Sequence, residues 1–122
     1  MSTPPRTNRP TVVAVPNPER TAALNDLAAA LLALGDDASK AAQSSRDVRL
    51  HVVACQAEHL AADVLDLLPH GPTDDVLPEG RGLASSANAA REAFHEPAAR
   101  PLPQSLAASL GWLLDLAEAA AA

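Results

Sequence analysis

The chain has 122 residues and a formal net charge of −6, and its nine Lys and Arg residues are scattered along the sequence. Phosphate binding needs clustered basic side chains, so this charge pattern argues against nucleic acid as a main partner. Ala and Leu dominate, Ile and Tyr are absent, and Phe and Trp occur once each. Good helix formers therefore far outnumber strand formers, and the composition predicts a single all-α domain.

The same composition bears on location and partners. The first ten residues lack the apolar stretch of a signal peptide, and the apolar run Leu27 to Leu34 is too short to span a membrane. The single cysteine, Cys55, fits a reducing compartment, so we expect a cytoplasmic protein without disulfides and with no membrane partner. A core of Ala and Leu buries little area per residue, which favours self-association or a protein partner. The low aromatic content argues against a small-molecule pocket.

The first predicted elements are a tail and a helix. Residues 1–16 are rich in Pro, Thr and Arg and read as a disordered tail, which leaves 17–122 as the helical domain. Asn17 can cap a helix, and Pro18 suits its first position. The helix is expected to run to Leu34 and to end at Gly35.

A long helix is predicted over about residues 37–68, because this stretch lacks Pro and Gly and Asp36 or Asp37 can cap it. Apolar residues recur on one side at helical spacing and form a seam. Its members are Leu50, Val53, Ala57, Leu60, Val64 and Leu67.

Two further helices complete the prediction. Gly71 to Gly82 reads as a loop, and a third helix is expected from Leu83 to His95. After a Pro-rich linker, a fourth helix is expected from Pro103 to Ala120. The sequence thus predicts a small four-helix bundle with one long central helix.

Polar residues follow the far side of the long helix at four-residue spacing: Asp47, His51, Cys55, His59 and Asp63. Neighbouring members of this ladder can share a metal ion, which suggests a metal site at His51, Cys55 and His59. Each step of four residues drifts by about 40° around the helix, so the whole ladder cannot form one site. The alternative is a solvated helix face, and we expect no resident cofactor.

Chemistry at Cys55 is a second functional alternative. A redox-sensing cysteine must be exposed and have a lowered pKa, and His51 and His59 lie one turn away. The position of Cys55 among Val52, Ala54 and Ala62 favours a buried, inert thiol instead. No nucleophile motif, acid–base pair or phosphate-binding loop is present, so we do not expect an enzyme.

The charges of the long helix suggest a homodimer. Basic residues lie in its first half and acidic residues in its second, which opposes the helix dipole. In an antiparallel dimer centred on Gln56, Arg46 would face Asp66 and Arg49 would face Asp63. The predicted interface therefore combines these charges with the seam and one aromatic anchor on the last helix: Arg46, Arg49, Val53, Leu60, Asp63, Val64, Asp66 and Trp112.

Four segments carry a family resemblance: Leu50 to Leu68, Asp74 to Pro78, Ala90 to Ala93, and Leu106 to Leu116. Over about residues 46–118 the chain resembles short, all-helical, uncharacterised proteins of actinobacteria. This resemblance implies a helical fold and transfers no activity or site residue. The sequence as a whole favours a non-enzymatic protein-interaction module, with a metal- or redox-responsive sensor as the alternative.

Overall fold

The computed structural model describes residues 17–68 and 82–122, and all of its regular elements there are helical. Helix α1 spans Pro18–Ala42, α2 spans Val48–Leu65, α3 spans Leu83–Phe94 and α4 spans Gln104–Ala121, with a short 3-10 turn, η2, at Pro97–Ala99. The all-α prediction is confirmed for this part of the chain. The predicted tail, residues 1–16, and nearly all of the loop predicted over Gly71 to Gly82 lie outside the described residues.

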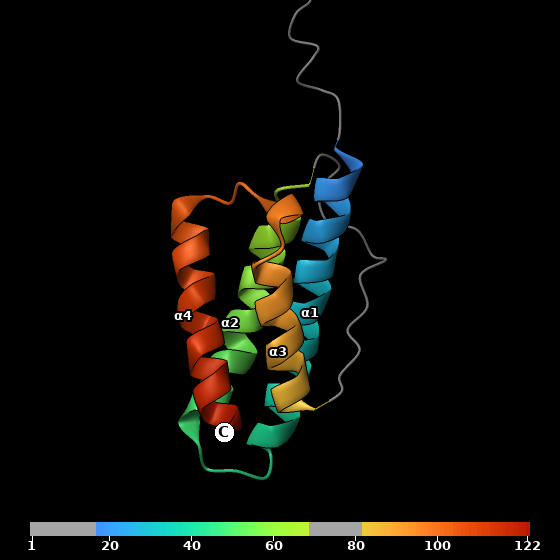
Figure 1. The fold of residues 1–122 in the computed structure, drawn as a ribbon. Helices are drawn as coiled ribbons and strands as arrows, with labels where there is room; N and C mark the ends of the chain where they lie inside the picture. Colours follow the sequence, from blue (N-terminus) through green and yellow to red (C-terminus); the bar gives the residue numbers. More distant parts are fainter. Residues whose placement is uncertain (1–16, 69–81) are drawn as a thin grey trace, which may run out of the picture.

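The four α-helices lie side by side (Figure 1). Helix α1 packs against α2 and α3, and α4 packs against the same two helices. Helices α2 and α3 run in one direction, whereas α1 and α4 run in the other (Figure 1). Every pair of packed neighbours is therefore antiparallel, and the α1–α3 pair and the α2–α4 pair form opposite sides of the molecule.

The core between the helices is built from leucine, valine and alanine. Alanines such as Ala28, Ala57 and Ala61 are fully buried and let the helices approach closely. The largest side chains that are fully buried come from α1, α2 and α4, and they are Leu24, Leu27, Leu31, Leu34, Val53, Val64, Leu110, Leu113 and Leu114.

Helix α1 begins as the sequence predicts. The side chain of Asn17 accepts hydrogen bonds from the amides of Glu19 at 3.0 Å and Arg20 at 3.2 Å. Pro18 occupies the first helical position, where its missing N–H is not needed. Two amides that lack partners at a helix start are thus satisfied.

The predicted end of the first helix at Gly35 is wrong, because Gly35 lies inside α1. A Cβ atom at this position would lie 3.3 Å from the carbonyl oxygen of Ala54 and 3.4 Å from the Cβ of Ala57, both in α2. Glycine here permits a close approach of two helices rather than a turn. This close approach offsets the roughly 1 kcal/mol that a mid-helix glycine costs.

The predicted single helix over 37–68 is also wrong, because its first residues belong to α1 and α2 begins only at Val48. The longest helix is therefore α1, with 25 residues, and α2 has 18. Predicted helices three and four agree closely with α3 and α4.

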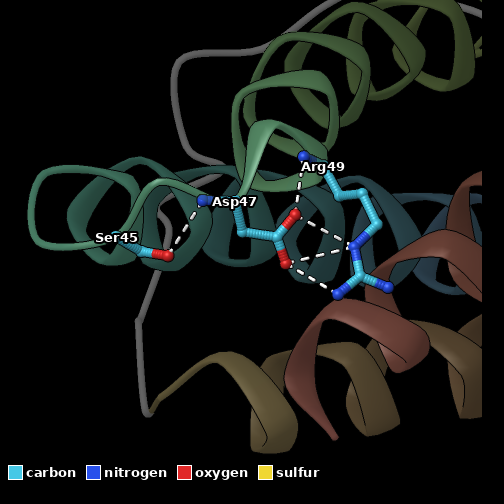
Figure 2. Close-up of polar contacts among 3 residues, drawn as sticks. All are labelled: Ser45, Asp47 and Arg49. Carbon is cyan, nitrogen blue, oxygen red and sulfur yellow. Dashed lines mark hydrogen bonds and ion pairs between the residues drawn. The ribbon is translucent and has the colours of Figure 1, made fainter.

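Side chains at the break between α1 and α2 explain why the helix does not continue. The hydroxyl of Ser45 accepts a hydrogen bond from the amide of Asp47 at 3.1 Å. The Asp47 carboxylate then accepts one from the amide of Arg49 at 3.0 Å, which caps α2 (Figure 2). Ser and Asp side chains compete in this way with helical hydrogen bonds, so they terminate one helix and start the next without Pro or Gly.

Asp37, which the sequence suggested as a cap for the following helix, instead joins α1 to α3. Its buried carboxylate accepts hydrogen bonds from the amide of Gly82 at 3.1 Å and from the hydroxyl of Ser86. Gly82 is the N-cap residue of α3 and has no side chain to fulfil that role. A carboxylate from α1 therefore satisfies the start of α3, where the helix dipole favours negative charge.

The connection between α3 and α4 is fixed by two arginines. Arg100 donates a hydrogen bond from Nη2 to the carbonyl oxygen of Phe94 at 2.8 Å, and its guanidinium lies 4.9 Å from the centre of the Phe94 ring. Arg20 of α1 donates from Nη2 to the carbonyl oxygen of Pro101 at 2.9 Å. The first contact ties the connection to the end of α3, and the second holds it against α1.

Candidate functional site

The seam residues predicted to form a homodimer are not on the surface. Val53 and Val64 are fully buried and Leu60 nearly so, in one core cluster with leucines of α1 and α4. The prediction that the seam faces a second copy therefore needs correction. Val53 and Val64 are covered by helices of their own chain, and a partner could reach them only if the core opened.

The outer side of α2 and the neighbouring α4 carries the large apolar side chains that remain exposed in the described residues. Val48 is 71% exposed, Val52 is 39% exposed and Trp112 is 53% exposed. On a helix, Val48 and Val52 are one turn apart and share a face, opposite the buried Ala57. Exposed apolar side chains that gather on two packed helices form a candidate binding surface.

The level of Trp112 relative to α2 follows from helix geometry. The last turns of α2 and the first turns of α4 line one shallow hollow, so Asp63 of α2 and Ser109 of α4 lie at about the same level. Because the two helices are antiparallel, moving from Ser109 forward to Trp112 corresponds to moving from Asp63 back towards His59. Trp112 therefore lies near the level of His59, and Val52 lies about 10 Å further along the axis. We call this surface the α2–α4 face and define it by Val48, Val52, Cys55, His59 and Trp112, all of which are exposed.

The two arginines at the start of α2, which the sequence predicts to pair with a second copy, are not both available for such pairing. Arg49 donates to the Asp47 carboxylate from Nε at 3.0 Å and from Nη2 at 2.7 Å (Figure 2). The hydrogen bonds from the Arg49 side chain, and then from its backbone amide, hold the pKa of Asp47 below its ordinary value. Arg49 is thus already neutralised within its own chain, whereas Arg46 is exposed and forms no ion pair within the described residues.

The acidic end of α2 borders the hollow between α2 and α4. Asp63 and Asp66 line it with Ser105 and Ser109, and its apolar wall is made by Leu60, Leu67 and Leu106. Asp63 lies 3.9 Å from Nε2 of His59, an ion pair when that histidine is protonated. Two carboxylates beside an apolar wall would receive a basic side chain that also has an aliphatic stem, such as arginine.

The polar ladder does not form a metal site in this structure. Asp47 is the cap of α2 rather than a member of its outer face, and His51, Cys55 and His59 all point to solvent. In the part of the chain that the structure describes, no three His, Cys, Asp or Glu side chains lie close enough to hold a metal ion. The prediction of a site at His51, Cys55 and His59 is therefore not supported by a single copy of the chain.

The expectation that Cys55 is buried is wrong, because the thiol is exposed. The helix wheel explains the difference, since Cys55 lies about 160° around α2 from the buried Ala57. Exposure is one of the two conditions for a reactive cysteine. Cys55 therefore remains available for chemistry and for labelling.

Sequence reasoning missed two features of the surface. Val48 and Val52 were not singled out, although the wheel that places Cys55 away from the core places Val48 there too. Arg91 of α3 also binds α4 through Asp115 at 2.7 Å and Glu118 at 2.9 Å, contacts that depend on the packing of two distant segments. These hydrogen bonds raise the pKa of Arg91, and the guanidinium holds the pKa of Glu118 below its ordinary value.

Comparison with protein-family models, with curated proteins and with solved structures gives no match to this chain. None of the helices in the described residues is long and apolar enough to cross a membrane. What the chain does must therefore be inferred from its own geometry.

Proposed function

We propose that the chain is a small, non-enzymatic, cytoplasmic protein-interaction module that self-associates through the α2–α4 face. The observation that carries this proposal is the exposure of Val48, Val52 and Trp112 on two helices that pack against each other. Such a module would act as an adaptor, a regulator or an accessory subunit. Kinship with the short actinobacterial proteins that it resembles is part of the proposal, and it concerns residues 46–118.

Burial of these side chains would provide the driving force. Apolar surface removed from water contributes about 25 cal/mol per Å², and a tryptophan is among the residues that most often anchor an interface. Trp112 follows Ser109, which lines the hollow, by about one turn of α4. Self-association through this face leaves the core of each copy intact.

The charges of α2 support a second copy as the partner. In an antiparallel arrangement centred on Gln56, the exposed Arg46, which immediately precedes the cap of α2, would come near the acidic end of the other copy, at Asp66. The pairing of Arg49 with Asp63 that the sequence predicts gives weaker support, because Arg49 already forms an ion pair with Asp47 of its own chain. The complementarity then depends mainly on Arg46, with one such contact at each end of the pair.

A charge-exchange experiment tests this arrangement by sedimentation equilibrium. Arg46→Asp and Asp66→Arg should each weaken the dimer, because each places like charges together, and the double variant should restore it. Arg49→Gln is the matched control and should change the dissociation constant less than Arg46→Gln. A chain that stays monomeric at all concentrations, or single variants that dimerise like the wild type, would contradict the proposal.

Cys55 offers an independent measurement on the unmodified protein. In the proposed dimer the two Cys55 Cα atoms lie about 10 Å apart, since each is one residue from the axis and packed helices are 8–10 Å apart. A short bis-maleimide should therefore join two wild-type chains, with a yield that follows dimer concentration. Cross-linking that is equally fast under dissociating dilution would show random collision instead.

A redox-responsive module is the second candidate, and the exposure of Cys55 favours it. In this case mild peroxide should oxidise the Cys55 thiol to a sulfenic acid or join two chains by a disulfide, and a reductant should reverse either change. Native mass spectrometry with and without reductant separates the candidates. A dimer of unmodified mass under both conditions supports association by packing alone.

A further inference from the structure

The outer side of α2 carries two neighbouring side chains of the kinds that bind transition metals. Cys55 and His59 lie four residues apart on this helix, and both are exposed. At this spacing the Cβ atoms are about 5–6 Å apart, so a thiolate and an imidazole can bind one ion together. Two ligands fill half of a tetrahedral zinc site, and the described residues of one chain offer no group of three ligands. A second copy of the same pair would complete the site.

The register of the antiparallel dimer brings the two pairs together. In an arrangement centred on Gln56, Cys55 lies about 1.5 Å and His59 about 4.5 Å from the two-fold axis, measured along the helix. His51 lies further away, at about 7.5 Å along the helix. Packed helices have axes about 8–10 Å apart, so side chains from both helices reach an ion that lies between them. The register therefore selects Cys55 with His59 rather than Cys55 with His51.

The surroundings of His59 fit a metal ligand. The carboxylate of Asp63, one turn further along α2, lies 3.9 Å from Nε2 of His59. A metal-bound histidine usually directs its second ring nitrogen towards a carboxylate, a carbonyl or water, which fixes the orientation of the ring. Asp63 can receive Nε2 in this way, which leaves Nδ1 of His59 for the ion on the side of Cys55.

Charge and donor type indicate which ion fits. Two Cys55 thiolates balance the double positive charge of Zn²⁺, and two neutral imidazoles add none. A site without net charge suits an interface that also buries Val52, because an unbalanced charge in apolar surroundings is costly. Sulfur and nitrogen donors favour zinc over Mg²⁺ and Ca²⁺, which prefer oxygen ligands.

We propose that two copies of the chain bind one Zn²⁺ ion between their α2 helices, through Cys55 and His59 of each copy. This inference rests on the proposed self-association through the α2–α4 face. Each thiol loses its proton when its sulfur binds the ion, so two protons leave for each zinc bound. The full set of four ligands exists only in the dimer, so zinc favours the dimer by mass action. Self-association thereby becomes dependent on the concentration of free zinc.

Cobalt titration of the untagged, reduced, full-length protein tests the ligand set. Co²⁺ occupies zinc sites, absorbs visible light strongly when its coordination is tetrahedral, and gives a charge-transfer band with thiolate. The wild type should reach maximum absorption at one ion per two chains, and Zn²⁺ should displace the cobalt. Cys55→Ser should abolish the charge-transfer band, and His59→Ala should weaken cobalt binding by more than about tenfold.

His51→Ala is the matched control, because it removes an exposed histidine at the same distance from Cys55 along the chain. This variant should bind cobalt as the wild type does. A maximum at one ion per chain, or cobalt binding that is lost in His51→Ala and kept in His59→Ala, would overturn the proposal.

Sedimentation equilibrium of the wild type, in chelator and with one Zn²⁺ per two chains, separates this inference from the proposed function. Zinc should lower the dissociation constant of the dimer by at least about tenfold. A dimer that forms equally well in chelator and in zinc overturns the zinc site and leaves the proposed self-association standing. A chain that is monomeric in chelator contradicts association by packing alone, and a zinc-dependent dimer would then still support the site. A monomer under both conditions overturns both proposals.

Discussion

The two sides of α2 differ in what covers them. The inner side, with Val53, Leu60 and Val64, is enclosed by helices of the same chain, whereas the outer side leaves Val48 and Val52 in water. The inner side has the stronger and more regular apolar pattern, yet it is the outer side that a partner can reach. A strong apolar seam therefore indicates burial, and the weaker stripe that remains indicates where an interaction can form.

The largest expected contrast is in folding stability. Leu60→Ala on the inner side should lower the free energy of unfolding by about 2–5 kcal/mol, because it removes buried methylene groups and leaves a cavity. Val52→Ala on the outer side should change it by no more than about 0.5 kcal/mol. Urea unfolding of both variants measures this contrast, and equal losses would show that the two sides are not distinct.

The inner side also depends on how α1 and α3 are held together. Asp37→Ala removes the carboxylate that caps α3 from α1, and we expect a loss of about 1–3 kcal/mol because the hydroxyl of Ser86 is left without this acceptor. Asp37→Asn keeps one acceptor oxygen and should lose less. If Asp37→Ala unfolds at the same urea concentration as the wild type, this link does not contribute to stability.

The close approach of α1 to the inner side of α2 provides a further test of how tightly that side is packed. Gly35→Val should cost about 1–3 kcal/mol, because its extra methyl groups meet the backbone of Ala54 and the side chain of Ala57. Gly35→Ala should be nearly neutral, since a higher helix propensity of about 1 kcal/mol offsets a tight Cβ contact. Thermal unfolding separates these outcomes, and a Gly35→Val variant as stable as Gly35→Ala would contradict close packing here.

The exposed ion pairs should have the smallest effect. Arg49 lowers the pKa of Asp47, and Arg91 lowers that of Glu118. A carboxyl group whose pKa is lowered by folding adds stability that is present above its unfolded pKa, about 4, and is lost as the pH falls through the folded value. We expect the urea midpoint to decrease below about pH 4 and Asp47→Asn to reduce part of that decrease; an Asp47→Asn profile parallel to the wild type would exclude this contribution.

Local signals in the sequence were sufficient for much of the fold. The composition predicts the helical class, and Asn17 with Pro18 predicts the start of α1, because propensity and capping act between near neighbours. Gly35 misleads because a glycine that ends a helix and one that admits a neighbouring helix look alike in sequence. The break at Asp47 is equally ambiguous, since a serine or aspartate can cap a helix or lie on its solvated face.

The candidate site was predictable only in part. Trp112 and the charged residues of α2 were proposed for the interface by residue type alone, and their part in an interface stays a prediction, although the structure shows that Trp112 is exposed. The burial of Val53, Leu60 and Val64 within one chain was not predicted, since periodicity shows that a face is buried but not which chain buries it. The exposure of Val48 and Val52 could be recognised only from the positions of the neighbouring helices.

The most direct test of the outer side of α2 as the association surface is sedimentation equilibrium of the wild type and of Val52→Glu. The proposed function predicts a concentration-dependent wild-type dimer and a monomeric Val52→Glu variant, because the added carboxylate would be buried without a partner in the interface. At concentrations where both are monomeric, the two proteins should unfold at the same urea concentration, since Val52 lies outside the core and dimerisation adds no stability there. A wild type that is monomeric throughout, or a Val52→Glu variant that dimerises as well as the wild type, would contradict it.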